Sequence, residues 1–162
     1  MMKKTTLCYI EHDGAYLLLH RVKKENDVNE GKWVGIGGHF LPGEEPDACL
    51  LREVWEETGI TLTDYRFAGR IRFEAPPWPS EIMYLYRARI DARPTLPECD
   101  EGVLAWVDKK EALSLPMWEG DRVFLSLMEE DGEPFSLLLR YEGDTLVENR
   151  LGGEELFADE AK

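Results

Sequence analysis

Alternating apolar and polar positions, interrupted by glycine and proline, predict a series of strands with a few helices. Residues 5–12 and 15–21 alternate on either side of Asp13-Gly14, a dipeptide that favours a tight turn between antiparallel strands. A polar loop over 23–32 precedes a short strand within 33–45 that ends in glycines and a proline turn. Further β segments are expected at 65–75, 81–92, 102–108, 134–141 and 145–151.

The clearest helix is expected over 46–58. Pro46 suits the first helical turn, and Gly59 stands where a helix ends in left-handed geometry. Positions at helical spacing supply the expected apolar contacts: Leu50, Leu51, Val54 and Trp55. The other side of the helix carries Arg52, Glu53, Glu56 and Glu57.

Two more helices complete the predicted elements. One spans about 109–114, where Asp108 and Glu111 have the spacing of a capping box, and a longer one spans about 121–131. Strands mixed with helices and hairpins predict an α/β (α+β) fold, a mixed β-sheet sandwiched between helices. At 162 residues we expect a single domain over 1–162, whose charged end, 155–162, is a candidate loose tail.

Composition narrows the possible functions. The net charge of −14 argues against DNA or RNA as a partner, since phosphate-binding surfaces rely on Lys and Arg. A small polyphosphate stays possible if a divalent metal lies between the two sets of negative charge. No segment has the apolar length of a membrane span and none resembles a secretory leader. Three cysteines without metal-type spacing indicate reduced thiols, so we expect a cytoplasmic protein.

The crowding of like charges on the helix at 46–58 needs an explanation. Glu53, Glu56 and Glu57 are spaced by three and four residues, where neighbouring carboxylates repel. They form either a solvated helix face or a site for a hard cation such as Mg²⁺, which prefers oxygen ligands. Clustered Mg²⁺ ions neutralise phosphates and activate water, as phosphoanhydride hydrolysis requires.

A longer motif resolves this choice. Residues 38–60 have the complete pattern of the Nudix box, with no departure at its fixed points: Gly38, Glu44, Arg52, Glu53, Val54, Glu56, Glu57, Gly59 and Ile60. The chain therefore resembles the Nudix hydrolases. The resemblance implies Mg²⁺, with Mn²⁺ able to replace it, held by Glu53, Glu56, Glu57 and the carbonyl of Gly38.

Other residues of the box keep two interpretations. Arg52 forms either an exposed ion pair with Glu56 or, as the resemblance implies, orients the catalytic glutamates. Gly37 and Gly38 are turn residues or let phosphate approach the backbone. Glu44 binds metal through water or favours the positive end of the following helix.

Beyond the box, the chain resembles the MutT-type oxidised purine nucleoside triphosphatases over almost its full length. The matching segments are 24–38, 99–107, 116–124 and 134–151. In this resemblance Glu101 is an additional acid near the metal, either a metal ligand or the general base. Its alternative is an acidic loop residue that precedes a strand.

The same resemblance implies residues that read the substrate's base. Trp118 stacks on the base, or is a core aromatic, and Asp121 binds the purine edge, or caps the helix that follows. Human-type relatives have asparagine where Val34 stands and aspartate where Gly120 stands. The preference among damaged purines is therefore left open.

Two further substrate contacts are weaker predictions. Arg21 is a phosphate contact or a solvated strand-end arginine, and Thr6 is a substrate contact or an ordinary strand residue. The three histidines, His12, His20 and His39, have no ligand spacing.

Three functions follow in order of preference. The first is a Mg²⁺-dependent pyrophosphohydrolase that converts 8-oxo-dGTP and water to 8-oxo-dGMP and pyrophosphate, sanitises the nucleotide pool and so serves DNA repair. The second keeps this chemistry for another nucleoside diphosphate-linked substrate, such as ADP-ribose or a dinucleotide. The third is a nucleotide-binding module without turnover. The oligomeric state does not follow from the sequence.

Overall fold

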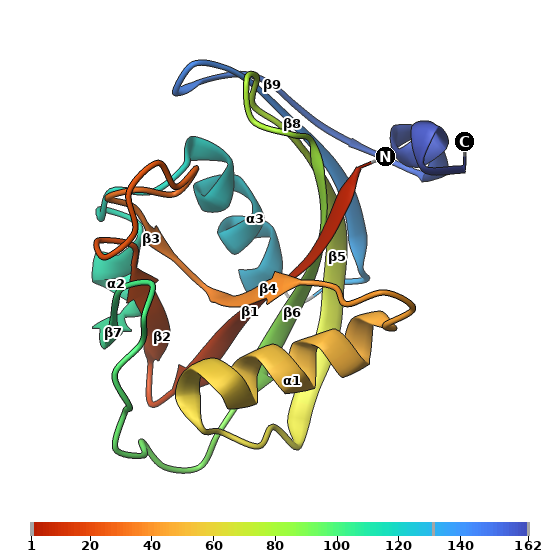
Figure 1. The fold of residues 1–162 in the computed structure, drawn as a ribbon. Helices are drawn as coiled ribbons and strands as arrows, with labels where there is room; N and C mark the ends of the chain where they lie inside the picture. The colour runs from red at the N-terminus through yellow and green to blue at the C-terminus, as the bar shows by residue number, and fades with distance from the viewer. Residues whose placement is uncertain (1, 131, 162) are drawn as a thin grey trace.

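The computed structural model describes residues 2–130 and 132–161. Its strands and helices alternate along the chain much as the sequence predicts (Figure 1). The strands are β1 (Lys3–His12), β2 (Ala15–His20), β3 (Trp33–Val34), β4 (Ile36–His39), β5 (Asp64–Glu74), β6 (Glu81–Arg89), β7 (Val103–Asp108), β8 (Phe135–Glu142) and β9 (Thr145–Gly152). The helices are α1 (Pro46–Thr58), α2 (Lys109–Ala112), α3 (Glu119–Glu129) and the 3-10 helix η1 (Glu154–Ala161).

The strands form one mixed sheet. Its main path runs β3-β2-β1-β6-β5-β8-β9, with β4 paired to β1 and β7 paired to β2. β1 is parallel to β6 and β5 is parallel to β8, whereas the other pairs are antiparallel. The predicted hairpin turn between β1 and β2 is present, and both Asp13 and Gly14 have positive φ, as a type I′ turn requires.

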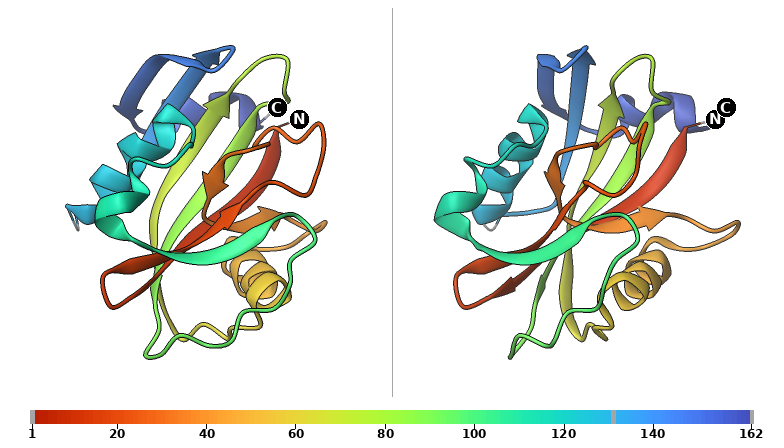
Figure 2. Two further views of the ribbon diagram at one scale, coloured as in Figure 1. Left: turned by 90° about the vertical axis from the view of Figure 1, so that its left-hand side faces the viewer. Right: turned by 60° about the vertical axis from the view of Figure 1, so that its left-hand side comes forward.

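Helices cover both faces of this sheet (Figure 2). Successive side chains of β1 point to opposite faces, so Tyr9 packs with Phe124 of α3, while Ile10 packs with Leu50 of α1. The two apolar clusters are therefore separated by the strands. The predicted fold, a mixed sheet between helices, is confirmed.

The helix that carries the acids has the predicted bounds. Pro46 occupies its first turn, and Gly59 adopts φ of 75° and donates its backbone N–H to the Trp55 carbonyl. One prediction on this helix is wrong, because the Trp55 side chain is 60% exposed and makes no core contact. Trp55 lies on the solvent side, while Leu50 and Val54 are fully buried.

Other boundaries differ from prediction. The expected strand within 33–45 is two short strands, and α2 is shorter than predicted, although Asp108 caps it by accepting from the Lys110 N–H at 2.8 Å. Helix α3 starts at Glu119 rather than at 121; its predicted end at Asp131 lies outside the described residues.

The chain end and the cysteines complete the description. Within the segment 155–162, Leu156 and Phe157 are buried against Ile82 and Leu138, whereas Lys162 is outside the described residues. All three cysteines are buried and free, as expected. Across 2–130 and 132–161, no helix combines the length and apolar character needed to cross a bilayer.

Candidate active site

One cleft of about 440 Å³ brings together most of the predicted site residues. They come from β1, β4, α1, the loop after β2, the turn before β7 and the start of α3. The cleft is lined by Thr6, Arg21, Gly37, Gly38, Glu53, Glu57, Glu101, Trp118 and Asp121. Arg52 and Glu56 are absent from its lining. A larger, open cavity of about 580 Å³ beside the start of α1 contains none of these residues, so the chemistry is placed in the smaller cleft.

The two glycines are strand residues that permit close approach. Gly38 pairs with Thr6 and Gly37 with Leu7 across β4 and β1. A Cβ atom at Gly37 would lie 1.8 Å from the Thr6 carbonyl oxygen, and one at Gly38 would lie 2.5 Å from the Glu53 carboxyl carbon. A side chain at Gly37 is therefore excluded by the backbone of Thr6, and one at Gly38 would displace the Glu53 carboxylate. Both glycines lie in β4, so the interpretation of Gly37 and Gly38 as turn residues is wrong.

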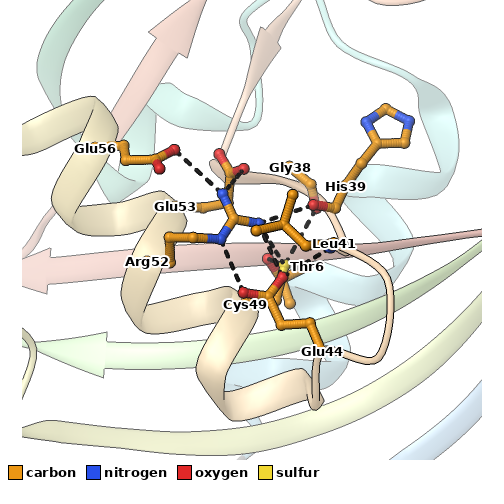
Figure 3. A network of polar contacts seen from close by, with 9 residues as sticks. All are labelled: Thr6, Gly38, His39, Leu41, Glu44, Cys49, Arg52, Glu53 and Glu56. Carbon is orange, nitrogen blue, oxygen red and sulfur yellow. Dashed lines mark hydrogen bonds and ion pairs between the residues drawn. The ribbon is translucent and has the colours of Figure 1, made fainter.

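Arg52 connects the box acids (Figure 3). Its guanidinium donates to both oxygens of Glu44, at 2.8 and 2.9 Å, and to Glu53 at 2.8 Å. It also reaches Glu56 at 3.2 Å and the His39 carbonyl at 3.0 Å. Arg52 is therefore far more than a partner of Glu56, since it fixes the carboxylate of Glu53 against Gly38.

Glu44 is held in its ionised form. Hydrogen bonds from Arg52 and from the Leu41 backbone N–H lower the pKa of the Glu44 carboxyl to about 2. Each of its oxygens accepts from Arg52. Glu44 thus anchors the arginine at the start of the helix.

The three glutamates of α1 have unequal surroundings. Burial raises the pKa of Glu53, while burial, followed by repulsion from Glu101 and Glu53, raises the pKa of Glu57 to about 8. The Glu57 Oε2 atom is buried and accepts no hydrogen bond. Glu56, by contrast, is 50% exposed. Two of these carboxylates, Glu53 and Glu57, therefore line the cleft and have raised pKa values, whereas Glu56 is not part of the lining.

Glu101 reaches this acidic end from the turn before β7. Arg21, just after β2, donates to Glu101 Oε2 at 2.8 Å and to Asp27 Oδ2 at 2.7 Å. The Arg21 side chain is only 13% exposed, so the interpretation as a solvated arginine is wrong. It is a buried cation between two acids.

The donor set fits a hard divalent cation. Glu57 is repelled by Glu101 and Glu53, and its Oε2 atom accepts no hydrogen bond from the described residues. A bound cation would stabilise the ionised form of this carboxyl. In residues 2–130 and 132–161, no group of three or more His, Cys, Asp or Glu side chains is already arranged to hold a metal ion. Mg²⁺ suits such an open site, because it keeps several waters and binds through few carboxylates and substrate oxygens.

Trp118 and Asp121 form the other end of the cleft. Trp118 is 4% exposed, donates its indole N–H to Asn29 Oδ1 at 2.9 Å, and packs edge-on against Phe73 and Tyr141. The Lys32 ammonium lies 4.4 Å from its ring centre. Trp118 is therefore part of the core and also lines the cleft.

Asp121 does not cap helix α3, so the interpretation of Asp121 as a helix cap is wrong. Trp118 occupies the cap position, and the Asp121 N–H donates to the Trp118 carbonyl. Burial raises the pKa of the Asp121 carboxyl to about 8, although Arg122 and Lys32 oppose this rise. Asp121 lies in the first turn of α3 and lines the cleft.

The two departures from the human-type pattern have structural reasons. Val34 is buried in the sheet beside Leu19. A Cβ atom at Gly120 would lie 2.4 Å from Leu139 Cδ1, and the Gly120 N–H donates to the Tyr141 hydroxyl at 2.7 Å. Position 120 is therefore filled by packing and has no room for an acid.

Thr6 is buried on β1, where its hydroxyl contacts the Cys49 sulfur at 3.4 Å. The sequence did not single out three other residues around the cleft: Asp27, Asn29 and Lys32. Asp27 and Asn29 have the spacing of a side chain-to-backbone turn, which was the available signal. Their partners are distant in sequence, so the contacts themselves could not be read from it.

Comparison with known proteins agrees with this geometry. The NUDIX domain model matches residues 2–128. An oxidized purine nucleoside triphosphate hydrolase of Danio rerio is 30% identical over 151 residues, covering 92% of this chain and 94% of that protein. A CTP pyrophosphohydrolase of Escherichia coli is 29% identical over 121 residues, covering 74% and 86%.

A solved structure extends the match. The crystal structure of a MutT protein from Bacillus halodurans has a TM-score of 0.78 and 28% identity, covering 93% of this chain and 97% of that one. The fold and the acid-lined cleft are those of a pyrophosphohydrolase. The chain belongs to the Nudix family, in its MutT-type group, and is a Nudix hydrolase. The hypothesis of a module without turnover is therefore set aside.

Proposed function

We propose that this enzyme hydrolyses oxidised purine nucleoside triphosphates, converting 8-oxo-dGTP and water to 8-oxo-dGMP and pyrophosphate. The observation that carries the proposal is one cleft that is lined both by the acids Glu53, Glu57 and Glu101 and by Trp118 and Asp121. Such a cleft can hold the phosphates and the base of one nucleotide. Sanitising a cytoplasmic nucleotide pool, and so limiting damage to DNA, is the role we assign to it.

The acidic end is assigned to the phosphates. Glu53, Glu56, Glu57 and Glu101, with the Gly38 carbonyl, would hold Mg²⁺ or Mn²⁺. Bound there, the ions would neutralise phosphate charge and lower the pKa of water. Arg52 would keep Glu53 in place. Because Arg21 engages only one oxygen of Glu101, the other is left for a metal or for the attacking water.

Trp118 and Asp121 are assigned to the base. A fixed aromatic ring and a buried carboxyl in the same cleft support recognition of a planar base with hydrogen-bonding edges. The Danio rerio relative bears the name of an oxidized purine nucleoside triphosphate hydrolase, which favours a damaged purine. Val34 and Gly120 supply no polar group, so fewer residues would discriminate among purines here.

A substrate panel tests the proposal. At fixed Mg²⁺, kcat/KM would be measured for 8-oxo-dGTP, dGTP, CTP and ADP-ribose, and the products identified by chromatography. We expect 8-oxo-dGTP to be the best substrate and to yield pyrophosphate. Equal turnover of 8-oxo-dGTP, dGTP and ADP-ribose would contradict the assignment.

A second candidate is another nucleoside triphosphate or a nucleoside diphosphate-linked compound. The apolar Val34 and the packed Gly120 favour it, because both positions lack a group to read a purine. The relative named CTP pyrophosphohydrolase supports this candidate as well. Preference for CTP or ADP-ribose in the same panel would select it.

A further inference from the structure

A chain of hydrogen bonds crosses the cleft from its acidic end to its aromatic end. Glu101 accepts from Arg21 at 2.8 Å, and Arg21 donates to Asp27 at 2.7 Å. The other oxygen of Asp27 accepts from the Asn29 N–H at 3.3 Å, and the side chain of Asn29 accepts from Trp118 at 2.9 Å. Two ends that are distant in sequence are thus linked through one loop.

Asp27 is the centre of this chain. Its side chain is 5% exposed and each of its two oxygens binds a different donor. A buried carboxylate with two separate partners fixes both of them, since moving either leaves an unsatisfied polar group. Arg21 cannot shift without affecting Asn29, and therefore Trp118.

Arg21 is the link that matters for the chemistry. Its guanidinium donates to Glu101 at 2.8 Å, and both side chains line the cleft with Glu53 and Glu57. The position of Arg21 therefore affects where Glu101 lies. The Arg21 side chain is only 13% exposed, so its ion pair with Asp27, rather than solvent, fixes its position.

We infer that Asp27 is a positioning residue that couples occupation of the base pocket at Trp118 to the placement of Glu101 beside the phosphates. The inference rests on the proposed function for the location of base and phosphates. A correct base would hold Trp118 and Asn29 still, and through Asp27 would fix Arg21 and Glu101. A substrate whose base fits badly would leave Glu101 less well placed. Poor recognition of the base would therefore lower kcat as well as raise KM.

The structural test needs no substrate. In ¹⁵N-labelled protein the Trp118 indole N–H signal is identified by its loss in Trp118→Phe. We expect Asp27→Asn and Glu101→Gln each to move this signal. Their matched controls, Glu25→Gln in the same loop and Asp100→Asn beside Glu101, remove the same charge from exposed positions and should leave it in place. An unmoved Trp118 signal in Glu101→Gln would overturn the coupling.

The kinetic test uses whichever nucleotide the wild-type enzyme hydrolyses fastest. Asp27→Asn should lower kcat about tenfold with a smaller change in KM, and Glu25→Gln should change neither. In a Glu101→Gln background the Asp27→Asn substitution should lower kcat by less than about twofold, since its effect passes through Glu101. Equal effects in both backgrounds would show a structural role and refute the inference.

The two proposals can fail separately. If 8-oxo-dGTP is not the preferred substrate, the proposed function falls, yet the indole signal and the double-mutant cycle still decide the role of Asp27. If the substrate panel succeeds and the cycle is additive, only the coupling is lost.

Discussion

The two ends of the cleft each contain a buried carboxyl whose pKa is raised to about 8, but for different reasons. Glu57 is buried and is also repelled by Glu101 and Glu53, whereas Asp121 is raised by burial alone, against the attraction of Arg122 and Lys32. A cation at the acidic end would relieve Glu57 and leave Asp121 almost unaffected. These surroundings favour a cation beside Glu57 and a neutral, hydrogen-bonding group beside Asp121.

The largest expected effect tests the acidic end. Glu57→Gln removes a charge that a metal needs, so kcat should fall about a thousandfold for every nucleotide. Folding should not suffer, because the substitution also removes a repelled, buried charge. Steady-state kinetics and thermal unfolding would be measured beside Glu45→Gln, an exposed acid just before α1. Retained activity in Glu57→Gln would reject the metal site.

Arg52→Lys is expected to have the next largest effect. A lysine cannot bind Glu44 through two nitrogens while also holding Glu53 and the His39 carbonyl. The kcat value should fall about a hundredfold, again for all nucleotides alike, with KM little changed. Arg150→Lys, at an exposed ion pair with Glu148 on β9, is the matched control. A kcat within twofold of wild type would mean that Glu53 needs no such orientation.

The aromatic end should respond differently. Trp118→Phe keeps an apolar ring and loses both the Asn29 hydrogen bond and part of the stacking area. We expect kcat/KM for the preferred nucleotide to fall about tenfold, and that for a poor substrate to change much less. Trp55→Phe, on the solvent side of α1, is the control. Equal losses for good and poor substrates would contradict base recognition by Trp118.

The smallest effect is the pH dependence of stability. The folded metal-free protein holds a proton on Asp121 up to pH about 8, but the unfolded chain releases it near its ordinary value of 3.8. Between these values the folded state binds more protons, so the free energy of unfolding should fall as pH rises.

Asp121→Asn should make this dependence weaker, with or without Mg²⁺. The corresponding contribution of Glu57 should shrink when Mg²⁺ is added, because the metal favours the ionised carboxylate. Urea unfolding between pH 5 and pH 9 would measure both, with Asp91→Asn in the exposed loop after β6 as the control. If Asp121→Asn leaves the slope of the unfolding free energy against pH unchanged, Asp121 is not a source of this pH dependence.

The sequence predicts a region well when local interactions determine its structure, and poorly when contacts with distant segments do. The acids of α1 lie at helical spacing between Pro46 and Gly59, so the helix bounds and the shared face follow from neighbouring residues. The same pattern predicted wrongly that Trp55 makes apolar contacts, because this side chain faces solvent. The predicted start of α3 is wrong because the sequence offered Asp121 as a helix cap, whereas Trp118 occupies the cap position.

The sequence by itself determined the fold class, the family and the candidate metal-binding acids, because these depend on spacing along one segment and on turn residues such as Asp13 and Gly14. Only the tertiary structure decided that Arg21 binds both Glu101 and Asp27, that Trp118 binds Asn29, and that Gly120 has no room for an acid. Those contacts join segments up to 89 residues apart, and their geometry depends on how the sheet brings loops together.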